Sequence, residues 1–220
     1  MVLLAATSGA LDALGFLALG GVFASVMTGN LVLLGLGIGS RNGGLLSHAV
    51  VAVSAYTLGV AVGAGLTRGG APVDIPGWSR KLHVVIAVEL GLLVVFTGGW
   101  ELVRSRSSSP AQLVLIALAA TAMGLQGAAM RVSTRNRLST TYLTGTLTGI
   151  VAGLAGGGRL GGEWMGVAVL GAALAGAAVA GAVLTERAAL APVVPLLALA
   201  GALVAGRTLA RDGRAEPSAA

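Results

Sequence analysis

The sequence has no cysteine and few charged residues, and both shortages narrow the class of protein. Without cysteine, the chain cannot form disulfides, iron–sulfur clusters, thiolate zinc sites or a cysteine nucleophile. Charged residues make up 10% of the 220 positions, whereas a typical soluble domain has about 25%. The chain therefore has too few charged side chains to build a surface that faces water.

Hydrophobic residues and glycine take the place of the missing charges. The sequence is 55% hydrophobic with 36 glycines, and its mean hydropathy is +0.91. Disorder requires low hydrophobicity, and collagen requires a glycine at every third position, so both are excluded. The net charge of +6 comes from basic residues scattered between apolar runs without interleaved aromatics, so no nucleic-acid partner is expected. The composition predicts an all-α, polytopic bundle of transmembrane helices in a lipid bilayer.

A helix needs about 20 mainly apolar residues to cross a bilayer. Residues 104–110, rich in arginine and serine, form a predicted linker between two membrane halves at 1–103 and 111–206, and residues 207–220 form a predicted disordered polar tail. The basic residues divide equally between the two sides when all segments cross, so the positive-inside rule does not orient the chain. Seven or eight hydrophobic segments are expected, at about 2–20, 22–39, 45–66, 83–102, 112–130, 140–156, 164–184 and 189–206.

Two pairs of short motifs recur at nearly the same offset, which predicts that the two halves are internal repeats. Residues 27–31 read Met-Thr-Gly-Asn-Leu, and residues 143–147, 116 positions later, read Leu-Thr-Gly-Thr-Leu. Residues 9–13 read Gly-Ala-Leu-Asp-Ala, and residues 124–128, at an offset of 115, read Gly-Leu-Gln-Gly-Ala. A single Thr-Gly match would carry little weight in so glycine-rich a chain, but two matches at one offset favour duplication.

The Thr-Gly motifs are candidate breaks in the helices of the two halves. Glycine tolerates unusual backbone conformations, and Thr or Asn can cap the half-helix that follows. A half-helix that begins at mid-membrane exposes N–H groups and the positive end of its dipole, which favour an anion. In transporters built from repeats, interrupted segments at matching places indicate the binding site. The residues concerned are Thr28, Gly29 and Asn30 in the first half and Thr144, Gly145 and Thr146 in the second.

The alternative is that these segments are continuous helices whose small residues allow close helix crossings. For most glycines we favour this interpretation, and for Gly29 and Gly145 both interpretations stay open. Small residues at a spacing of four occur as Gly59 with Gly63, as Gly145, Gly149 and Gly153, and as Ala172, Gly176 and Ala180.

Several of these segments also resemble a known family. Gly-Ala-Leu-Asp-Ala-Leu-Gly-Phe-Leu at 9–17, the run around Met-Thr-Gly-Asn at 20–35, Met-Gly-Leu-Gln-Gly-Ala-Ala-Met-Arg at 123–131 and Thr-Thr-Tyr-Leu-Thr-Gly-Thr-Leu-Thr-Gly at 140–149 resemble the YoaK-like family of bacterial integral membrane proteins. The resemblance implies a multi-pass protein of the bacterial cytoplasmic (inner) membrane with no assigned biochemical activity. Family members usually have Asn where this chain has Gly127, which argues against a role that needs a polar side chain there.

Two acidic residues lie well inside apolar segments, namely Asp12 and Glu89. A charged carboxylate at the bilayer centre costs on the order of 3 kcal/mol or more, so an intramembrane acid suggests a functional site by default. We expect Asp12 to accept hydrogen bonds from Thr28, Asn30 or the start of a half-helix. Gln126 lies in the segment of the second half that matches Asp12. The alternative is that each acid is neutral and bonds to a neighbouring helix.

Other polar residues are weaker candidates. The threonines at 141, 144 and 148 form one helical stripe, and such a stripe more often makes hydrogen bonds to its own backbone or to a neighbouring helix than it binds a solute. The arginines at 131, 135 and 137 are expected in an interfacial loop. His48 and His83 lie far apart without partners at metal-ligand spacing, so no metal site is expected. No catalytic or nucleotide-binding motif occurs, so we expect neither an enzyme nor a cofactor.

The sequence favours a small-solute permease or channel-like transporter with a midplane site at the repeat interface. The solute would be small and polar or anionic, and Asp12 or Glu89 could carry a coupling proton. The alternative is a non-transporting membrane partner that stabilises or regulates another membrane complex, and a homo-oligomer is compatible with either. The predicted pathway residues are Asp12, Thr28, Gly29, Asn30, Glu89, Gln126, Thr144, Gly145 and Thr146.

Overall fold

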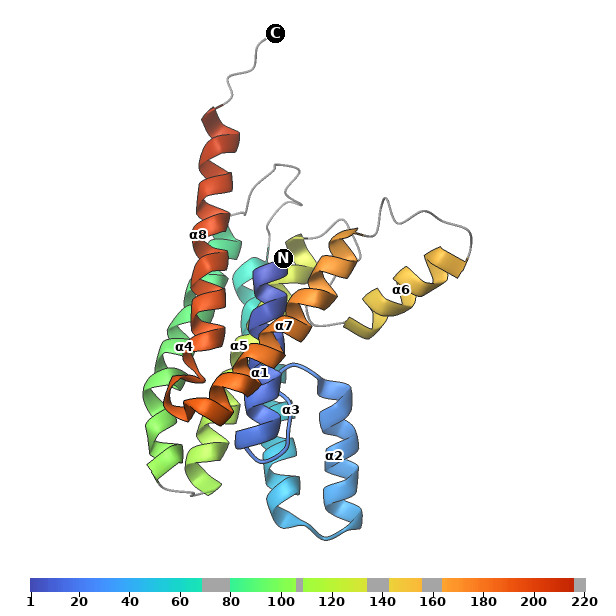
Figure 1. Cartoon of the computed structure of the whole chain (residues 1–220), viewed down its shortest axis with the longest axis vertical. Helices are drawn as coiled ribbons and strands as arrows, with labels where there is room; N and C mark the ends of the chain where they lie inside the picture. Colours follow the sequence, from blue (N-terminus) through green and yellow to red (C-terminus); the bar gives the residue numbers. More distant parts are fainter. Residues whose placement is uncertain (69–79, 106–108, 134–142, 156–163, 216–220) are drawn as a thin grey trace.

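The structure, a computed structural model, describes residues 1–68, 80–105, 109–133, 143–155 and 164–215 (Figure 1). These residues form α-helices and one short 3₁₀ helix, which confirms the predicted all-helical membrane bundle. The elements are α1 (Val2–Ala18), α2 (Met27–Gly39), α3 (Gly43–Thr67), α4 (Arg80–Ser105), α5 (Ser109–Ser133), α6 (Leu143–Ala155), α7 (Trp164–Glu186), η2 (Ala188–Leu190) and α8 (Val193–Ala215).

The helices fall into a long and a short class. Helices α3, α4, α5, α7 and α8 contain stretches long and apolar enough to cross a membrane, whereas α1, α2 and α6 are shorter apolar helices. A helix satisfies its backbone hydrogen bonds internally, which is what the hydrocarbon core of a bilayer demands. The predicted seven or eight segments therefore consist of five long spans and three short helices in the described part of the chain.

Some predicted boundaries are wrong. Helix α2 begins at Met27 rather than near residue 22, because Gly20 and Gly21 adopt positive φ angles of 89° and 76°, which end the helical path. Helix α8 continues to Ala215, so residues 207–215 are helical although they were predicted to be a disordered tail. Arginine and alanine are strong helix formers, so a polar composition alone does not end a helix.

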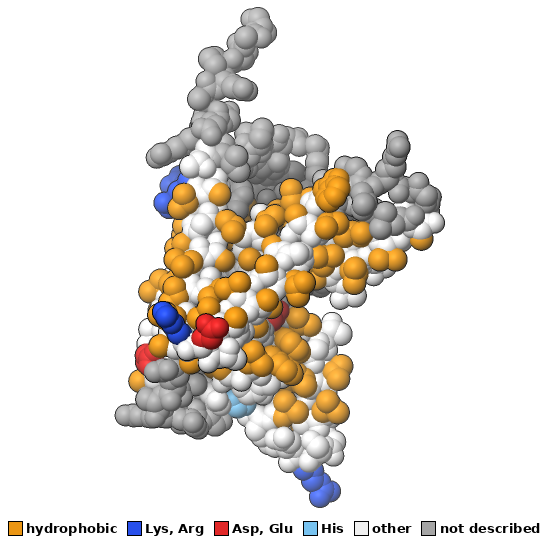
Figure 2. Space-filling view, viewed as in Figure 1, with side chains coloured by type: hydrophobic (Ala, Val, Ile, Leu, Met, Phe, Trp, Pro, Cys, Tyr) orange, Lys and Arg blue, Asp and Glu red, His pale blue; other side chains and the backbone are white. Residues whose placement is uncertain are grey.

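Helix α5 lies at the centre of the bundle. Of its most apolar stretch, 72% is buried, against 22–33% for the other four long spans. The outer helices instead expose large hydrophobic side chains, such as Leu174 at 73% and Leu197 at 66%. Figure 2 shows hydrophobic side chains spread over one face of the bundle, with few charged groups among them. Such a surface suits contact with lipid tails rather than water.

The two halves of the chain pack crosswise. Helix α1 packs on α7 and α8, and α5 packs on α3 and α4, so the first helix of each half contacts the third and fourth helices of the other. Within each half, the second helix packs on the third, as α2 on α3 and α6 on α7. Helices α2 and α6 both begin at the first residue of the predicted Thr-Gly motif.

Glycines make the two crosswise contacts close. A Cβ added at Gly9 would overlap the carbonyl oxygen of Ala173, and one at Gly176 would overlap that of Ala6. In the other crossing, a Cβ at Gly59 would overlap the carbonyl oxygen of Thr121, and one at Gly124 would overlap that of Tyr56. The predicted packing role is therefore confirmed for Gly59 and Gly176.

The same packing role is wrong for Gly149 in α6, and it has no support at Gly145, where both interpretations stood open. A Cβ at Gly145 or Gly149 would meet nothing within 4 Å among the described atoms. Among the described helices, α6 has its larger contacts with α7 alone, so no described helix lies against this face of α6. A spacing of four therefore indicates a crossing only where a second helix is available.

The two central helices run antiparallel. Gln112, near the start of α5, donates a hydrogen bond from Nε2 to the Ala18 carbonyl at the end of α1 (3.2 Å). Gln126, near the other end of α5, donates from Nε2 to the Leu4 carbonyl near the start of α1 (3.2 Å). Side-chain donors on one helix thus bond to carbonyls of the other at both ends.

Candidate functional site

Asp12 holds the connection between α1 and α2. One of its carboxylate oxygens accepts a hydrogen bond from the Ser25 backbone N–H at 2.7 Å, and the other accepts one from the Ser25 hydroxyl at 2.5 Å. Of the three predicted donors, Thr28 and Asn30 are wrong, and the third, the start of a half-helix, comes nearest to what the structure shows. The partner is instead a residue just before the start of α2, because residues 19–26 fold back along α1 (Figure 1).

A pair of buried serines extends this contact along α1. Ser8, one helical turn before Asp12, donates from its hydroxyl to the Ser25 hydroxyl at 2.9 Å, and both serines are buried. The three side chains thus form a chain of hydrogen bonds from Ser8 through Ser25 to Asp12. The sequence analysis did not single out either serine. Ser8 could have been found, because it lies four residues before Asp12 and therefore on the same helix face.

Asn30 clamps the same connection from the other side. Its side-chain oxygen accepts from the Phe23 N–H at 2.9 Å, and its Nδ2 donates to the Phe23 carbonyl at 2.7 Å. Asn30 is fully buried, where unpaired backbone groups are costly. It thereby gives a non-helical residue the two backbone partners that a helix would supply.

The break therefore lies before the Thr-Gly motif rather than at it. The capping position of α2 is Val26, which makes no side-chain capping bond, so the predicted capping by Thr28 or Asn30 is wrong. Gly29 lies in the first turn of α2, where a Cβ would approach the Phe23 ring at 3.1 Å. The unusual backbone is at Gly20, where φ is 89° and a Cβ would overlap the His48 ring. Thr28 itself is exposed.

We predict that Ser25→Ala lowers the free energy of unfolding by about 1–3 kcal/mol, because the Asp12 carboxylate loses its hydroxyl donor and Ser8 loses its acceptor. The matched control is Ser47→Ala, since the Ser47 hydroxyl is exposed and bonds only within its own helix, to the Gly44 carbonyl. Thermal unfolding in detergent measures both. Equal midpoints for the two variants would show that the Ser8–Ser25–Asp12 chain contributes nothing.

Glu89 lies on the buried face of α4. Its exposed fraction is 0%, and its neighbours on the same face, Val85, Ile86 and Leu93, are also fully buried. Neither carboxyl oxygen has a hydrogen-bond partner within the described part of the chain. Helix α4 packs mainly on α5 and α8, which both belong to the second half. Glu89 is therefore an acid without hydrogen bonds to any described residue, and it lies in the helix of the first half that packs on the second half.

Gln126 and the α6 threonines occupy three different surroundings. Gln126 is fully buried and links α5 to α1 through the Leu4 carbonyl. Thr146 is 8% exposed and lies against α7, since a Cβ at Gly166 would meet its methyl group at 3.2 Å. Thr144 is exposed and accepts, through its carbonyl, a hydrogen bond from the Thr148 hydroxyl at 2.9 Å.

The predicted site residues therefore do not form one cluster. The structure joins Asp12 to the segment before α2, but it places the two Thr-Gly motifs on different helix pairs, α2 with α3 and α6 with α7. Figure 1 shows α2 and α6 apart from each other. The threonine at 141 and the arginines at 135 and 137 lie outside the described residues, whereas Arg131 lies in the last turn of α5 and not in a loop. A pathway role for any of these residues stays a prediction.

The long apolar spans, the hydrophobic exterior and the buried polar groups define a polytopic helical membrane protein. Residues 1–205 match the family described as "Protein of unknown function (DUF1275)", and the chain belongs to that family. It is 34% identical over 154 residues to the UPF0700 transmembrane protein YoaK of Bacillus subtilis (strain 168), a match that covers 70% of this chain and 65% of that relative. The predicted YoaK-like resemblance is confirmed. No solved structure matches the chain.

Proposed function

We propose that the protein is a small-solute transporter of the bacterial cytoplasmic membrane rather than an enzyme. In this proposal its two halves are inverted repeats, and the solute crosses between them. The solute is small and polar or anionic, and Glu89 carries a coupling proton. The carboxyl group takes up a proton when it is reached from one side of the membrane and releases the same proton on the other side.

The helix arrangement supports the repeat. Corresponding glycines make corresponding contacts, because Gly9 meets α7 near Ala173 while Gly124, its counterpart at an offset of 115, meets α3 near Tyr56. The first helices of the two halves, α1 and α5, run antiparallel through the centre. Repeats with inverted topology, which rock against each other around a central site, are a common architecture of secondary transporters.

The burial of Glu89 without a hydrogen-bond partner among the described residues is the observation that carries the proposal. A polar group buried without a hydrogen bond lowers stability by about 1–3 kcal/mol, and a charged one by more. Ionisable groups of this kind within membrane spans mark ion pathways and proton relays. The buried Glu89 carboxyl group lowers stability in the arrangement seen here. In the proposal, a second arrangement of the two halves exposes this carboxyl group to water, and its function depends on that exposure.

The connection between α1 and α2 provides a second polar region for the pathway. Two helices that meet at a non-helical segment inside a membrane protein are tolerated where the segment is buried in protein or lines a cavity. Here residues 19–26 are held by Asp12 and Asn30. In the transporter, this clamp fixes the start of α2, and the pathway residues of α2 move with it.

Solute entry into proteoliposomes tests the proposal without a known substrate. Vesicles with and without the protein are exposed to gradients of amino acids, small organic acids, phosphate and neutral polyols, and solute entry is followed by light scattering as the vesicles swell. We expect at least one solute to enter faster with the unaltered protein, and Glu89→Gln to lower that rate about tenfold or more. Glu186→Gln, a change of an exposed acid at the end of α7, is the control with an unchanged rate.

A non-transporting membrane partner is the second candidate, and one observation favours it. Asn30 is fully buried with its side chain bonded to Phe23, and both oxygens of Asp12 are bonded to Ser25, so this region is filled by the protein's own polar groups. This candidate predicts that swelling rates equal those of empty vesicles for every solute in the panel, which would overturn the transporter proposal.

A further inference from the structure

Helices α1 and α2 together cross the bundle only once. The end of α1 lies at the start of α3, since a Cβ at Gly20 would overlap the His48 ring. The end of α2 lies there too, because a Cβ at Gly37 would meet the Leu46 backbone at 2.9 Å. Helix α2 has 13 residues and is about 20 Å long, too short to cross the roughly 30 Å hydrocarbon core alone. Figure 1 shows both helices running toward the turn that begins α3.

One end of the bundle holds the start of α1 and the ends of α3, α5 and α8. The hydrogen bond from α5 to the Leu4 carbonyl places the end of α5 beside the start of α1. A Cβ at Gly201 of α8 would meet the Leu3 side chain at 3.3 Å, and one at Gly63 of α3 would meet the Cβ of Ala128 in α5 at 2.8 Å. These four helix ends therefore lie on the same side of the membrane.

The start of α4 lies at this same end, and the end of α4 lies at the opposite one. Lys81 donates a hydrogen bond from Nζ to the Arg68 carbonyl, just after α3. Trp100 donates from Nε1 to the Ala188 carbonyl, just after α7, at 2.8 Å. The opposite end of the bundle therefore holds the ends of α4 and α7 together with the turn between α2 and α3 (Figure 1).

The described basic residues divide unequally between these two ends. Those at the first end, which we call the basic end, are Arg68, Arg80, Lys81, Arg131, Arg207, Arg211 and Arg214. Those at the opposite end are Arg41, Arg104 and Arg187. The arginines at 106, 135, 137 and 159 lie outside the described residues. The equal division expected from the sequence requires every hydrophobic segment to cross, whereas α1 and α2 make one crossing between them.

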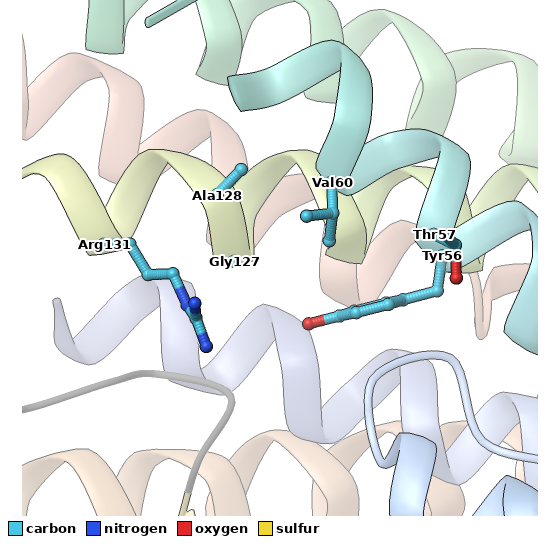
Figure 3. A pocket seen from close by; sticks show the side chains of 6 residues that line it. All are labelled: Tyr56, Thr57, Val60, Gly127, Ala128 and Arg131. Atoms are coloured by element: carbon cyan, nitrogen blue, oxygen red, sulfur yellow. The ribbon is translucent and has the colours of Figure 1, made fainter. Parts of the chain in front are cut away.

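The charge of Arg131 counts toward the basic end whatever its guanidinium group contacts. Figure 3 shows the Arg131 side chain on α5, in a pocket that Tyr56 lines from α3. If Arg131 is left out, the basic end still has most of the described basic residues. The asymmetry therefore does not depend on this one side chain.

We propose that the basic end of the bundle faces the cytoplasm, where it contacts the anionic head groups of the cytoplasmic leaflet. Short loops beside membrane spans carry an excess of Lys and Arg on the cytoplasmic side. Anionic lipids of that leaflet attract basic residues next to the spans. The start of α1 and the end of α8 then lie in the cytoplasm, and the turn between α2 and α3 faces the outside. The inference rests on the membrane localisation in the proposed function but not on transport.

Labelling of single cysteines in bacterial spheroplasts that express the full chain tests this orientation. The chain has no cysteine, so Ser40→Cys, between α2 and α3, and Thr208→Cys, in α8 at the basic end, each introduce one thiol at an exposed position. Thiols react as thiolates and need water. We expect a membrane-impermeant maleimide to label Ser40→Cys and not Thr208→Cys in intact spheroplasts, and to label both after permeabilisation. Glu186→Cys, at the end of α7, should behave as Ser40→Cys does.

A reporter on the C-terminus gives a second readout of the same orientation. A fluorescent protein that matures only in the cytoplasm should fluoresce when it is fused after the last residue, and alkaline phosphatase at the same place should be inactive. The reverse result with either reporter would overturn the orientation. Labelling of Thr208→Cys in intact spheroplasts, or partial labelling of both cysteines, would overturn it as well.

Removal of basic residues tests whether charge sets the orientation. A combined Arg68→Gln, Arg80→Gln and Lys81→Gln variant should invert part of the protein, seen as a loss of complete labelling at Ser40→Cys. The matched control, Arg41→Gln, Arg104→Gln and Arg187→Gln, removes three basic residues from the opposite end and should keep labelling complete. Complete labelling in both variants would overturn the contact with anionic lipid. Fractionation away from the cytoplasmic membrane would overturn the proposed localisation, whereas a failure to transport solute would change none of these results.

Discussion

Glu89→Leu should yield a protein that folds, unfolds at a higher temperature than the unaltered chain, and no longer moves solute across vesicles. The leucine fills the space of a carboxyl group whose two oxygens have no hydrogen-bond partner among the described residues. The neighbouring buried side chains on this face of α4, Val85, Ile86 and Leu93, are aliphatic, so leucine suits the surroundings. The expected gain in the free energy of unfolding is about 1–3 kcal/mol.

The combination of higher stability and lost transport separates function from folding. Replacing a residue that serves packing or hydrogen bonding lowers the stability of the protein, whereas replacing a residue that is retained for function often raises it. Thermal unfolding in detergent and vesicle swelling on the same preparations measure the two effects. Loss of stability in Glu89→Leu would show that the carboxyl group is a structural element, and Glu186→Leu, at an exposed position, provides the baseline for a generic acid-to-leucine change.

Gly124→Ala should prevent stable folding, although the change adds a single methyl group. The new Cβ would overlap the Tyr56 carbonyl oxygen and approach the backbone of Gly59 and Val60 within about 3 Å. Backbone atoms cannot rotate away as a side chain can, so α3 and α5 would have to separate. Overpacking typically costs about 1–3 kcal/mol and occasionally more. Here the overlap is with backbone atoms and α5 is the central helix of the bundle, so we expect a cost at the upper end of this range.

The crosswise packing predicts the same result at a second position. Gly9→Ala should be as damaging, because its Cβ would overlap the Ala173 carbonyl oxygen where α1 crosses α7. The control is Gly91→Ala in α4, where a Cβ would meet nothing within 4 Å among the described atoms. That change should be neutral or stabilise by up to about 1 kcal/mol, since alanine favours a helix over glycine. Fluorescence-detected size exclusion and thermal midpoints measure all three, and a folded Gly124→Ala with an unchanged midpoint would contradict the packing.

Much of the architecture follows from the sequence because lipid leaves little choice. Apolar runs of the length of a bilayer must be helices, and the predicted segments at 45–66, 83–102 and 112–130 correspond to α3, α4 and α5. The matched motifs also located Gly9 and Gly124, whose backbones now make corresponding crossings. A close helix crossing requires a small side chain at the point of contact. Because this requirement concerns single residues, a local sequence pattern can predict where such crossings occur.

The partners of the polar residues were not predictable in the same way. Asp12 was expected to bond to Thr28, Asn30 or the start of a half-helix. The chain folds back before α2, so the donor is Ser25, which directly precedes the N-cap of α2. This depends on positive φ angles at Gly20 and Gly21, in a chain where glycine is common everywhere and one Gly-Gly pair has no distinctive signal. Glu89 has no hydrogen-bond partner among the described residues. This depends on which faces of α4 and its neighbours meet, and hydropathy does not specify those faces.

Reaction of a buried cysteine beside Glu89 tests most directly whether the two halves open. The chain has no cysteine, so Leu93→Cys, one helical turn from Glu89 and at a position that is fully buried in this structure, introduces the only thiol. A thiol reacts as its thiolate and therefore needs water at the site. The variant is first shown to unfold at the same temperature as the unaltered chain and is then placed in proteoliposomes. We predict that a small water-soluble thiol reagent labels its cysteine within minutes. No labelling after hours, with Glu186→Cys labelled completely, would contradict a pathway between the halves.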